Sequence, residues 1–303
     1  MAVTRRRFIT ISAAMALLPA VARAGQGATR QWTGQALGAR ASIRLDHPDG
    51  EAIAARAMAE IARLEDILSL YRPASALSRL NGDGRLDNPP FELLECLSLA
   101  GSVHRASGGR FDPTVQPLWA LWAEAAANGR RPDAGAIEAV LRRTGWDKVR
   151  LDAAAITLAP GTALTLNGIG QGYVADRVAA LLEAEGLTDI LVDTGELRAL
   201  GGAPDGGDWP VRLETGARLP LRQRSLATSA PLGTTFDQGG RDGHILDPVT
   251  GRPTPAQWRA ISISAPSAAI ADALATAACL VPDRAGIDAM AASFEGARVE
   301  ACA

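Results

Sequence analysis

The sequence predicts an α+β fold with a mixed or antiparallel sheet and packed helices, forming a single domain in one or two lobes. Short apolar runs typical of strands alternate irregularly with amphipathic helical patterns along the 303 residues. No linker, low-complexity segment or internal repeat divides residues 25–303. A hydrophobic content of 47% over this length is enough to bury a substantial core.

The first 24 residues are expected to be a signal peptide outside the folded domain. Thr4-Arg5-Arg6-Arg7-Phe8-Ile9 is a twin-arginine pattern, and the apolar stretch that follows, residues 9–18, is too short to span a bilayer. Ala22-Arg23-Ala24 matches a small-residue cleavage site. A retained N-terminal anchor is the alternative. We therefore expect a periplasmic domain at residues 25–303, exported by the twin-arginine route and without a membrane span.

The remaining elements follow from local patterns. Helical periodicity is expected at residues 51–69, 75–81, 91–107, 136–143 and 268–280. Strands are expected as two runs within residues 31–45 and at residues 149–151, 156–158, 190–192, 197–200, 211–213, 225–229 and 261–265. Residues 110–119 hold two prolines and a tryptophan, which favours an ordered loop in which Asp112 caps the next segment.

Residues 164–182 have the pattern of a short strand, a glycine loop and a helix. Three glycines alternate in the loop between Asn167 and Gly172, which leaves backbone groups bare for a ligand. The helix that follows presents its N-terminus, a favourable place for a phosphate. The spacing differs from the dinucleotide-binding GxGxxG pattern, and a tight turn without a ligand is the alternative.

Asp272 and Thr276 are four residues apart on an otherwise apolar helix, so they share one face. A buried carboxylate needs a partner. A carboxylate and a hydroxyl, joined by backbone carbonyls, suit a hard cation such as Mg²⁺. The alternative is that Asp272 bonds a neighbouring loop and Thr276 bonds its own helix.

Composition and charge exclude several classes of protein. The formal net charge of −2 and the absence of a basic excess argue against a nucleic-acid partner. Three cysteines without a CxxC pair argue against a disulfide framework or a thiolate zinc site. A Cys96–Cys279 bridge stays open, and buried thiols are expected. No Ser/His/Asp signature or G-x-S-x-G pattern accompanies His244, which precedes Asp247-Pro248 in a loop.

Six segments carry a resemblance to a known family. They are YRPxS with SRLN from Tyr71, GxFDPTVxPL from Gly109 with Trp122, GIGQGYVADR from Gly168, LATSA from Leu226, HILDPVTGRP from His244 and ADALATA from Ala271. In this order they resemble the ApbE family of FAD:protein FMN transferases, over most of residues 25–303. The exported form is also similar to members associated with maturation of the nitrous-oxide reduction machinery.

The resemblance implies a fold related to the T-fold and a phosphoryl transfer. FAD is the substrate, Mg²⁺ lies on its pyrophosphate, and a Thr or Ser hydroxyl of an acceptor flavoprotein attacks the FMN-side phosphorus. AMP leaves, and FMN remains joined to the acceptor through a phosphoester. Such a reaction needs neutralised charge and in-line positioning more than covalent help from the protein.

The resemblance also implies roles for individual residues. The metal ligands would be Asp272, Thr276 and the backbone carbonyls of Gly168 and Ala275. His244 is the candidate for the general base or for orienting the acceptor hydroxyl. The FAD contacts would be Leu37, Tyr71, Arg110, Phe111, Asp112, Thr165, Gln171 and Leu246.

Four positions depart from the family pattern. Thr165 replaces an acid, Gln171 replaces Lys or Glu, Thr194 replaces the first of two glycines, and Ala230 replaces the last glycine of ATSG. Each change removes a charge or alters how closely the backbone is approached. Two alternatives therefore stay open: a non-catalytic FAD-binding maturation factor, and an FAD hydrolase that yields FMN and AMP.

Overall fold

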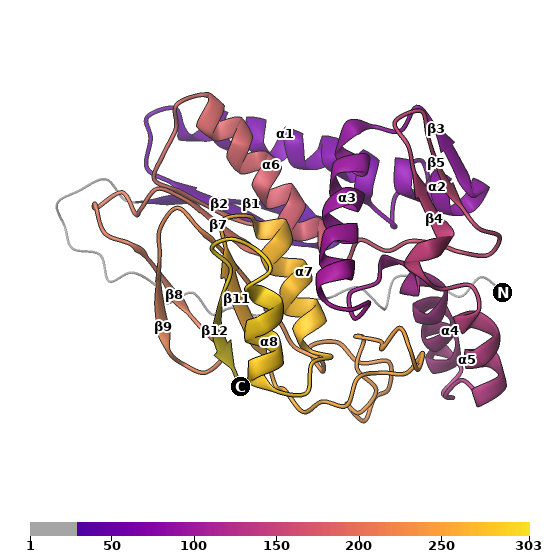
Figure 1. Cartoon of the computed structure of the whole chain (residues 1–303). Coiled ribbons are helices and arrows are strands. Elements are labelled where there is room, and N and C mark those ends of the chain that lie inside the picture. The colour runs from indigo at the N-terminus through magenta and orange to yellow at the C-terminus, as the bar shows by residue number, and fades with distance from the viewer. Residues whose placement is uncertain (1–28) are drawn as a thin grey trace.

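A seven-stranded antiparallel sheet is the centre of the molecule (Figure 1). The computed structural model describes residues 29–303, so the predicted signal peptide lies outside the described residues. All six strand pairings in the sheet are antiparallel, which confirms the predicted α+β class. The strands in spatial order are β1 (Arg30–Ala36), β2 (Ala39–Leu45), β6 (Ile190–Asp193), β7 (Leu197–Leu200), β10 (Ser225–Ser229), β11 (Ile261–Ala265) and β12 (Arg298–Cys302).

The two faces of the sheet are covered by different elements. Alternate residues of a strand point to opposite faces. On β6, Ile190 and Val192 join the main core, whereas Leu191 joins a second apolar cluster. The main core also contains α1 (Gly50–Leu68), α6 (Gly170–Ala184) and α7 (Ala268–Ala278). The second cluster contains the hairpin β8 (Trp209–Arg212) and β9 (Arg218–Leu221).

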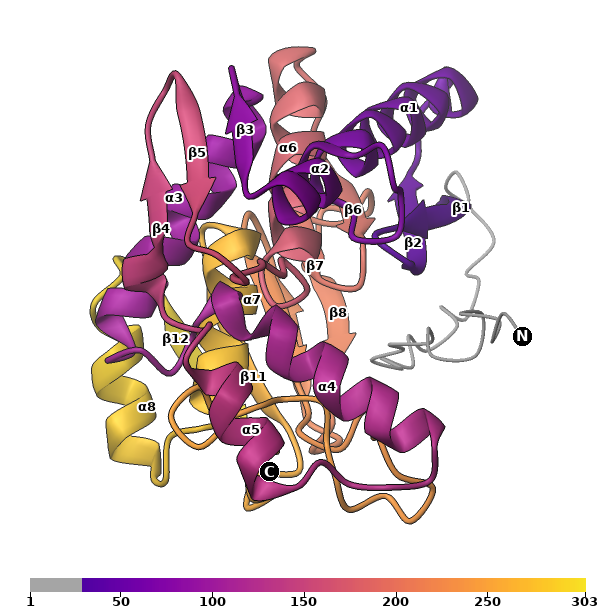
Figure 2. The same cartoon turned by 90° about the vertical axis from the view of Figure 1, so that its right-hand side faces the viewer.

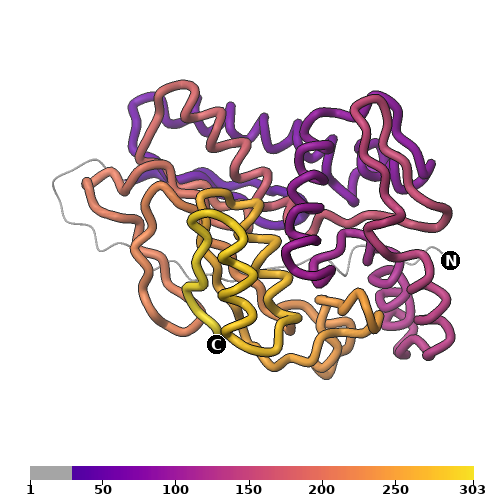
Figure 3. The backbone as a smooth tube through the Cα atoms, in the orientation of Figure 1, coloured from indigo at the N-terminus to yellow at the C-terminus, as the bar shows by residue number. Residues whose placement is uncertain are grey.

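Two smaller units flank the sheet. A three-stranded sheet of β3 (Arg85–Asp87), β5 (Ala155–Leu158) and β4 (Val149–Leu151) lies next to α2 (Ala76–Asp83) and α3 (Phe91–Ala106), and the chain path shows α3 between this sheet and α7 (Figure 3). The helices α4 (Gln116–Ala127) and α5 (Ala134–Leu141) pack together beside the loop that precedes β11 (Figure 2). The last helix is α8 (Arg284–Ala291).

The described residues differ from the predicted elements at several places. The loop expected at residues 110–119 includes the start of α4, because Pro117 lies in the first helical turn, where its missing N–H costs nothing. Asp112 does cap the short 3₁₀ helix Pro113–Val115, as expected. The elements β3, β9, β12 and α8 were not predicted. β3 has three residues, and β9 and β12 bury too few residues to show an apolar alternation.

The segment predicted as the central strand, residues 164–166, forms no strand. Its backbone is instead bound by one side chain: the Leu164 N–H donates to Asn81 Oδ1 at 2.7 Å, and Asn81 Nδ2 donates to the Leu164 carbonyl at 2.8 Å. The Thr165 N–H donates to the Pro113 carbonyl at 2.8 Å. The side-chain amide of Asn81 therefore satisfies the backbone groups that a neighbouring strand would otherwise satisfy.

The three alternating glycines serve close packing rather than an unusual backbone conformation. None of them has a positive φ, and α6 already begins at Gly170. A Cβ at Gly172 would clash with the carbonyl group of Ala268 at the start of α7. A Cβ at Gly168 would lie 3.0 Å from Thr276 Oγ1. The glycines thus bring α6 and α7 together.

The sequence also predicts buried thiols and no membrane span after residue 24. Cys96, Cys279 and Cys302 are free thiols, so the Cys96–Cys279 bridge does not form, and the first two are buried as expected. Within residues 29–303, no helix has the length and apolarity needed to cross a membrane.

We predict that Gly172→Ala lowers the free energy of unfolding by about 1–3 kcal/mol, because α6 and α7 must separate to admit a methyl group. Gly82→Ala is the matched control, since Gly82 lies in α2 with open space around it. It should instead stabilise the protein by about 0.5–1 kcal/mol. Urea unfolding measures both, and equal effects would contradict close packing at Gly172.

Candidate active site

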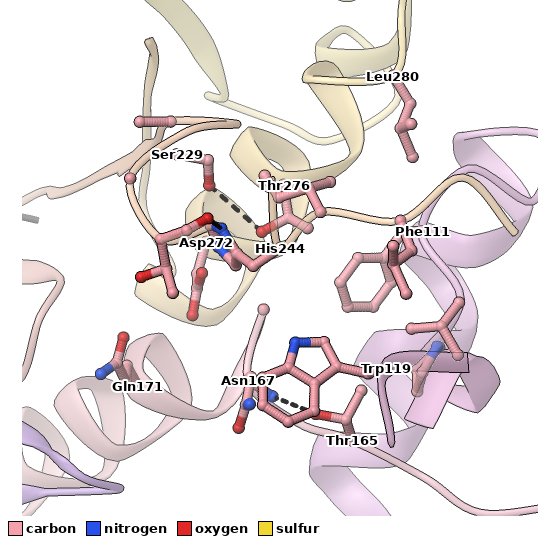
Figure 4. A pocket seen from close by; sticks show the side chains of 18 of the residues that line it. Phe111, Trp119, Thr165, Asn167, Gln171, Ser229, His244, Asp272, Thr276 and Leu280 are labelled. Carbon is pink, nitrogen blue, oxygen red and sulfur yellow. Dashed lines mark hydrogen bonds between the residues drawn. The ribbon is translucent and has the colours of Figure 1, made fainter. Parts of the chain in front are cut away.

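One pocket collects most of the residues predicted from the sequence. Eleven of the thirteen predicted site residues line it, and only Leu37 and Ala275 do not. The eleven are Tyr71, Arg110, Phe111, Asp112, Thr165, Gly168, Gln171, His244, Leu246, Asp272 and Thr276. Figure 4 shows several of these side chains around the opening, with Asp272 and Thr276 on α7. Their roles remain predictions, but their convergence is a property of the fold.

The two remaining residues lie behind the pocket wall. Leu37 is in the turn between β1 and β2, where its N–H donates to Glu65 Oε1 at 2.9 Å and its side chain packs close to Gly170. Leu37 can therefore support the start of α6 but does not face the cavity. Ala275 is fully buried in α7, so only its carbonyl could act as a ligand.

Asp272 and Thr276 are fixed by contacts from distant segments. Asp272 is 3% exposed, and its Oδ2 accepts a hydrogen bond from the Gly172 N–H at 3.2 Å. Thr276 Oγ1 lies 3.3 Å from Ser229 Oγ at the end of β10 (Figure 4). Since Gly168 also approaches Thr276 closely, the glycine segment and α7 form one oxygen-lined corner of the pocket.

Sequence reasoning missed a second carboxyl group in this pocket. Glu196 follows β6 and is 6% exposed, and its Oε2 accepts a hydrogen bond from the Thr228 N–H at 3.2 Å. Burial and the nearby Asp272 carboxyl raise the pKa of Glu196, and burial raises the pKa of Asp272. The sequence shows two acidic residues in the segment Asp193–Glu196 after a buried strand, but it does not indicate which way their side chains point.

Burial favours the neutral imidazole of His244. Its Nδ1 lies 3.1 Å from the Thr234 carbonyl, which can only accept a hydrogen bond, so Nδ1 carries the proton. Burial lowers the pKa of His244, although the carbonyls of Thr234 and Pro231 favour the charged form. The lone pair of the neutral ring then lies on Nε2, as a general base requires.

Three of the residues predicted to contact FAD form hydrogen bonds within the protein. The Asp112 carboxylate accepts hydrogen bonds from the backbone N–H and the hydroxyl of Thr114, at 2.8 and 2.6 Å. The Arg110 guanidinium donates to the carbonyls of Ser107 and Leu280. The Thr165 hydroxyl accepts a bond from the Asn167 N–H at 3.2 Å. These bonds hold the pocket rim in place.

Thr194 replaces a glycine of the family pattern, and it makes a side-chain hydrogen bond that glycine cannot make. Thr194 is fully buried, and its hydroxyl donates to the Gln171 carbonyl at 2.8 Å. Gly195 has a φ of +103° and packs against the Gln171 side chain, so a Cβ there would be strained and crowded. The departure therefore links the turn after β6 to the first turn of α6.

The sequence of this chain matches a known protein family. The model of the ApbE family matches residues 37–301. This chain belongs to the ApbE family. The match spans every segment on which the resemblance was based.

Several similar proteins are named as flavin transferases. The FAD:protein FMN transferase of Treponema pallidum is 33% identical over 72% of this chain and 67% of its own length. That of Vibrio cholerae is 29% identical over 84% and 82%. The flavinyl transferase ApbE of Pseudomonas stutzeri superimposes with a TM-score of 0.79 at 28% identity, covering 90% of each chain.

We predict that His244 makes stability depend on pH. The unfolded chain binds a proton at this histidine near pH 6.5, whereas the folded protein binds it only at lower pH. Because the unfolded state then holds more protons, stability falls as the pH drops below about 6.5, by at most about 1.4 kcal/mol per pH unit.

Urea unfolding between pH 5 and 8 tests this prediction by comparing the wild type with His244→Gln. The variant should lose the part of the acid destabilisation that His244 causes. His47→Gln, which alters an exposed imidazole before α1, is the control. Parallel loss of stability in the wild type and His244→Gln would show that the buried imidazole has no such effect.

Proposed function

We propose that this chain is an FAD:protein FMN transferase. The observation that carries the proposal is the convergence of Asp272 and Thr276 with the glycine segment at Gly168 in one pocket. Relatives that bear this activity in their names match most of the chain. The pocket also contains His244 and an aromatic and polar rim suited to a flavin nucleotide.

A divalent cation, which we propose to be Mg²⁺, fits the donors of the pocket. The Asp272 carboxylate, the Thr276 hydroxyl and the carbonyls of Gly168 and Ala275 would hold it, and all are hard oxygen donors. The Cys279 N–H donates to the Thr276 carbonyl, and the Cys279 thiol donates to the Ala275 carbonyl at 3.4 Å. When bound, the cation would neutralise charge on the FAD pyrophosphate.

The donor set also has the size expected for such a cation. Over residues 29–303 there is no group of three or more His, Cys, Asp or Glu side chains that could hold a metal ion. A site with few protein ligands suits Mg²⁺, which usually keeps several waters and takes phosphate oxygens from its substrate. The donors therefore fit a cation that binds together with FAD.

The chain's own residues would then position the reacting groups. The acceptor Thr or Ser oxygen forms a bond to the FMN-side phosphorus, and the bond from that phosphorus to the AMP oxygen breaks. The hydroxyl proton passes to Nε2 of His244, whose other nitrogen is held by the Thr234 carbonyl. Phe111, Trp119 and Leu246 provide apolar walls that exclude water from the transferred group.

The partner and location follow from the proposal and the N-terminal sequence. The acceptor would be a flavoprotein of the periplasm or membrane that carries the Thr or Ser to be modified. Export by the twin-arginine route would deliver this chain folded to the same compartment.

We predict that Asp272→Asn reduces flavin transfer at least about 1,000-fold, since the cation would lose its only carboxylate ligand on α7. The purified domain is mixed with FAD, MgCl₂ and a flavoprotein acceptor, and covalent flavin is read by in-gel fluorescence after denaturation. Asp147→Asn, which changes an exposed carboxylate, should leave transfer unchanged.

The same assay separates the two alternatives. FAD bound without any AMP release would identify a non-catalytic maturation factor. Release of FMN and AMP in the absence of an acceptor, without a fluorescent band in its presence, would identify a hydrolase. Either result would overturn the transferase proposal.

We predict that replacing Arg5 and Arg6 together by lysine blocks export. The twin-arginine pathway reads this arginine pair, so the variant should accumulate in the cytoplasm with its signal peptide attached. Cell fractionation and the mass of the recovered chain measure the result. Unchanged periplasmic recovery of the variant would contradict the assigned route.

A further inference from the structure

Glu196 presents one free carboxylate oxygen to the pocket beside Asp272. Its Oε2 is bonded to the Thr228 N–H, and no hydrogen bond within residues 29–303 occupies its Oε1. This oxygen is not sealed off from solvent, and Glu196 is one of the residues that line the cavity. A side chain that is 94% buried thus directs an unpartnered carboxyl oxygen towards the site.

The hydrogen bond from the Thr228 N–H explains why residue 196 needs a hydrogen-bond acceptor. It does not explain why that acceptor is a carboxyl group. β10 pairs with β7 only at Ser225 and Leu226, so the Thr228 N–H is left without a strand partner. The Glu196 carboxylate takes that place. A glutamine oxygen would satisfy the same N–H equally well, and a neutral amide would cost less to bury. The presence of a carboxyl group instead of an amide therefore needs another explanation.

No positive side chain balances the two carboxyl groups. Among the described residues, neither Glu196 nor Asp272 forms a salt bridge, and no positive side chain lowers the pKa of either group, while nearby Asp193 adds repulsion at Glu196. Two buried carboxyl groups that face one cavity without a counter-ion resist ionisation, and a cation from solution would favour the ionised form of both. Their placement in one pocket therefore suits a divalent cation.

We propose that Glu196 is the second carboxylate of the cation centre formed by Asp272, Thr276 and Gly168. It supplies a second negative charge and accepts hydrogen bonds from the water ligands of the cation. Mg²⁺ retains such waters, and carboxylates that bond the waters of a metal commonly set its affinity. This inference rests on the proposed cation site and assigns it a residue outside the α7 motif.

Glu196→Gln isolates the charge, because the amide oxygen can still accept from the Thr228 N–H. The variant and the wild type are titrated with MnCl₂ in the absence of nucleotide, and free Mn²⁺ is measured by electron paramagnetic resonance. We expect the dissociation constant to rise about 10- to 100-fold. Glu214→Gln, an exposed glutamate on the β8–β9 hairpin, should bind as the wild type does.

Thermal unfolding gives a second readout that a purely structural role would not produce. In chelator, Glu196→Gln should unfold at a higher temperature than the wild type, because a buried unbalanced charge is gone. With saturating MgCl₂ the rise in midpoint should be smaller for the variant, since tighter binding gives a larger shift. A lower midpoint in chelator with an unchanged Mg²⁺-induced rise would make Glu196 a structural residue only.

The outcomes distinguish this inference from the proposed function. If Asp272→Asn abolishes Mn²⁺ binding but Glu196→Gln binds as tightly as the wild type, the cation site stands and the role of Glu196 is overturned. If the wild type binds no Mn²⁺, the cation site itself is wrong, and the role of Glu196 falls with it.

Discussion

The reciprocal contact between α6 and α7 determines the geometry of the whole site. The Gly172 N–H of α6 donates to the Asp272 carboxylate of α7. In return, the Asp176 carboxylate of α6 accepts from the Ser267 hydroxyl and from the N–H groups of Ala268 and Ala269, where α7 begins. A carboxylate at a helix N-terminus satisfies free N–H groups and complements the helix dipole. This pair of contacts sets Asp272 and Thr276 against the glycine segment.

The opposite wall of the pocket belongs to a separate apolar cluster. Leu118, Trp122 and Phe236 form its core, together with Leu246, which also lines the pocket. The Trp122 N–H donates to the Gly251 carbonyl at 2.8 Å, which ties the loop before β11 to α4. The pocket therefore lies between two independently packed cores, and each supplies one side of it. Such junctions are common positions for ligand sites.

Function at this site is gained at some cost in stability. Buried carboxyl groups without positive partners weaken the folded state when no cation is present. Binding of a cation to the folded state alone offsets that cost by mass action. The large core beneath α6 and α7, with almost every α7 side chain buried, supplies the stability that such an arrangement requires.

Local patterns in the sequence determined the α+β class and most element positions, and the resemblance to the ApbE family identified eleven residues of the pocket. Periodicity reports which face of each helix or strand is buried, and the spacing of Asp272 and Thr276 places both on one helical face. Only the tertiary structure decided that Glu196 joins them, that Leu37 lies behind the wall, and that residues 164–166 are held by Asn81 rather than by a strand. These features depend on contacts between segments 30 to 130 residues apart, and local sequence patterns carry no information on such distances.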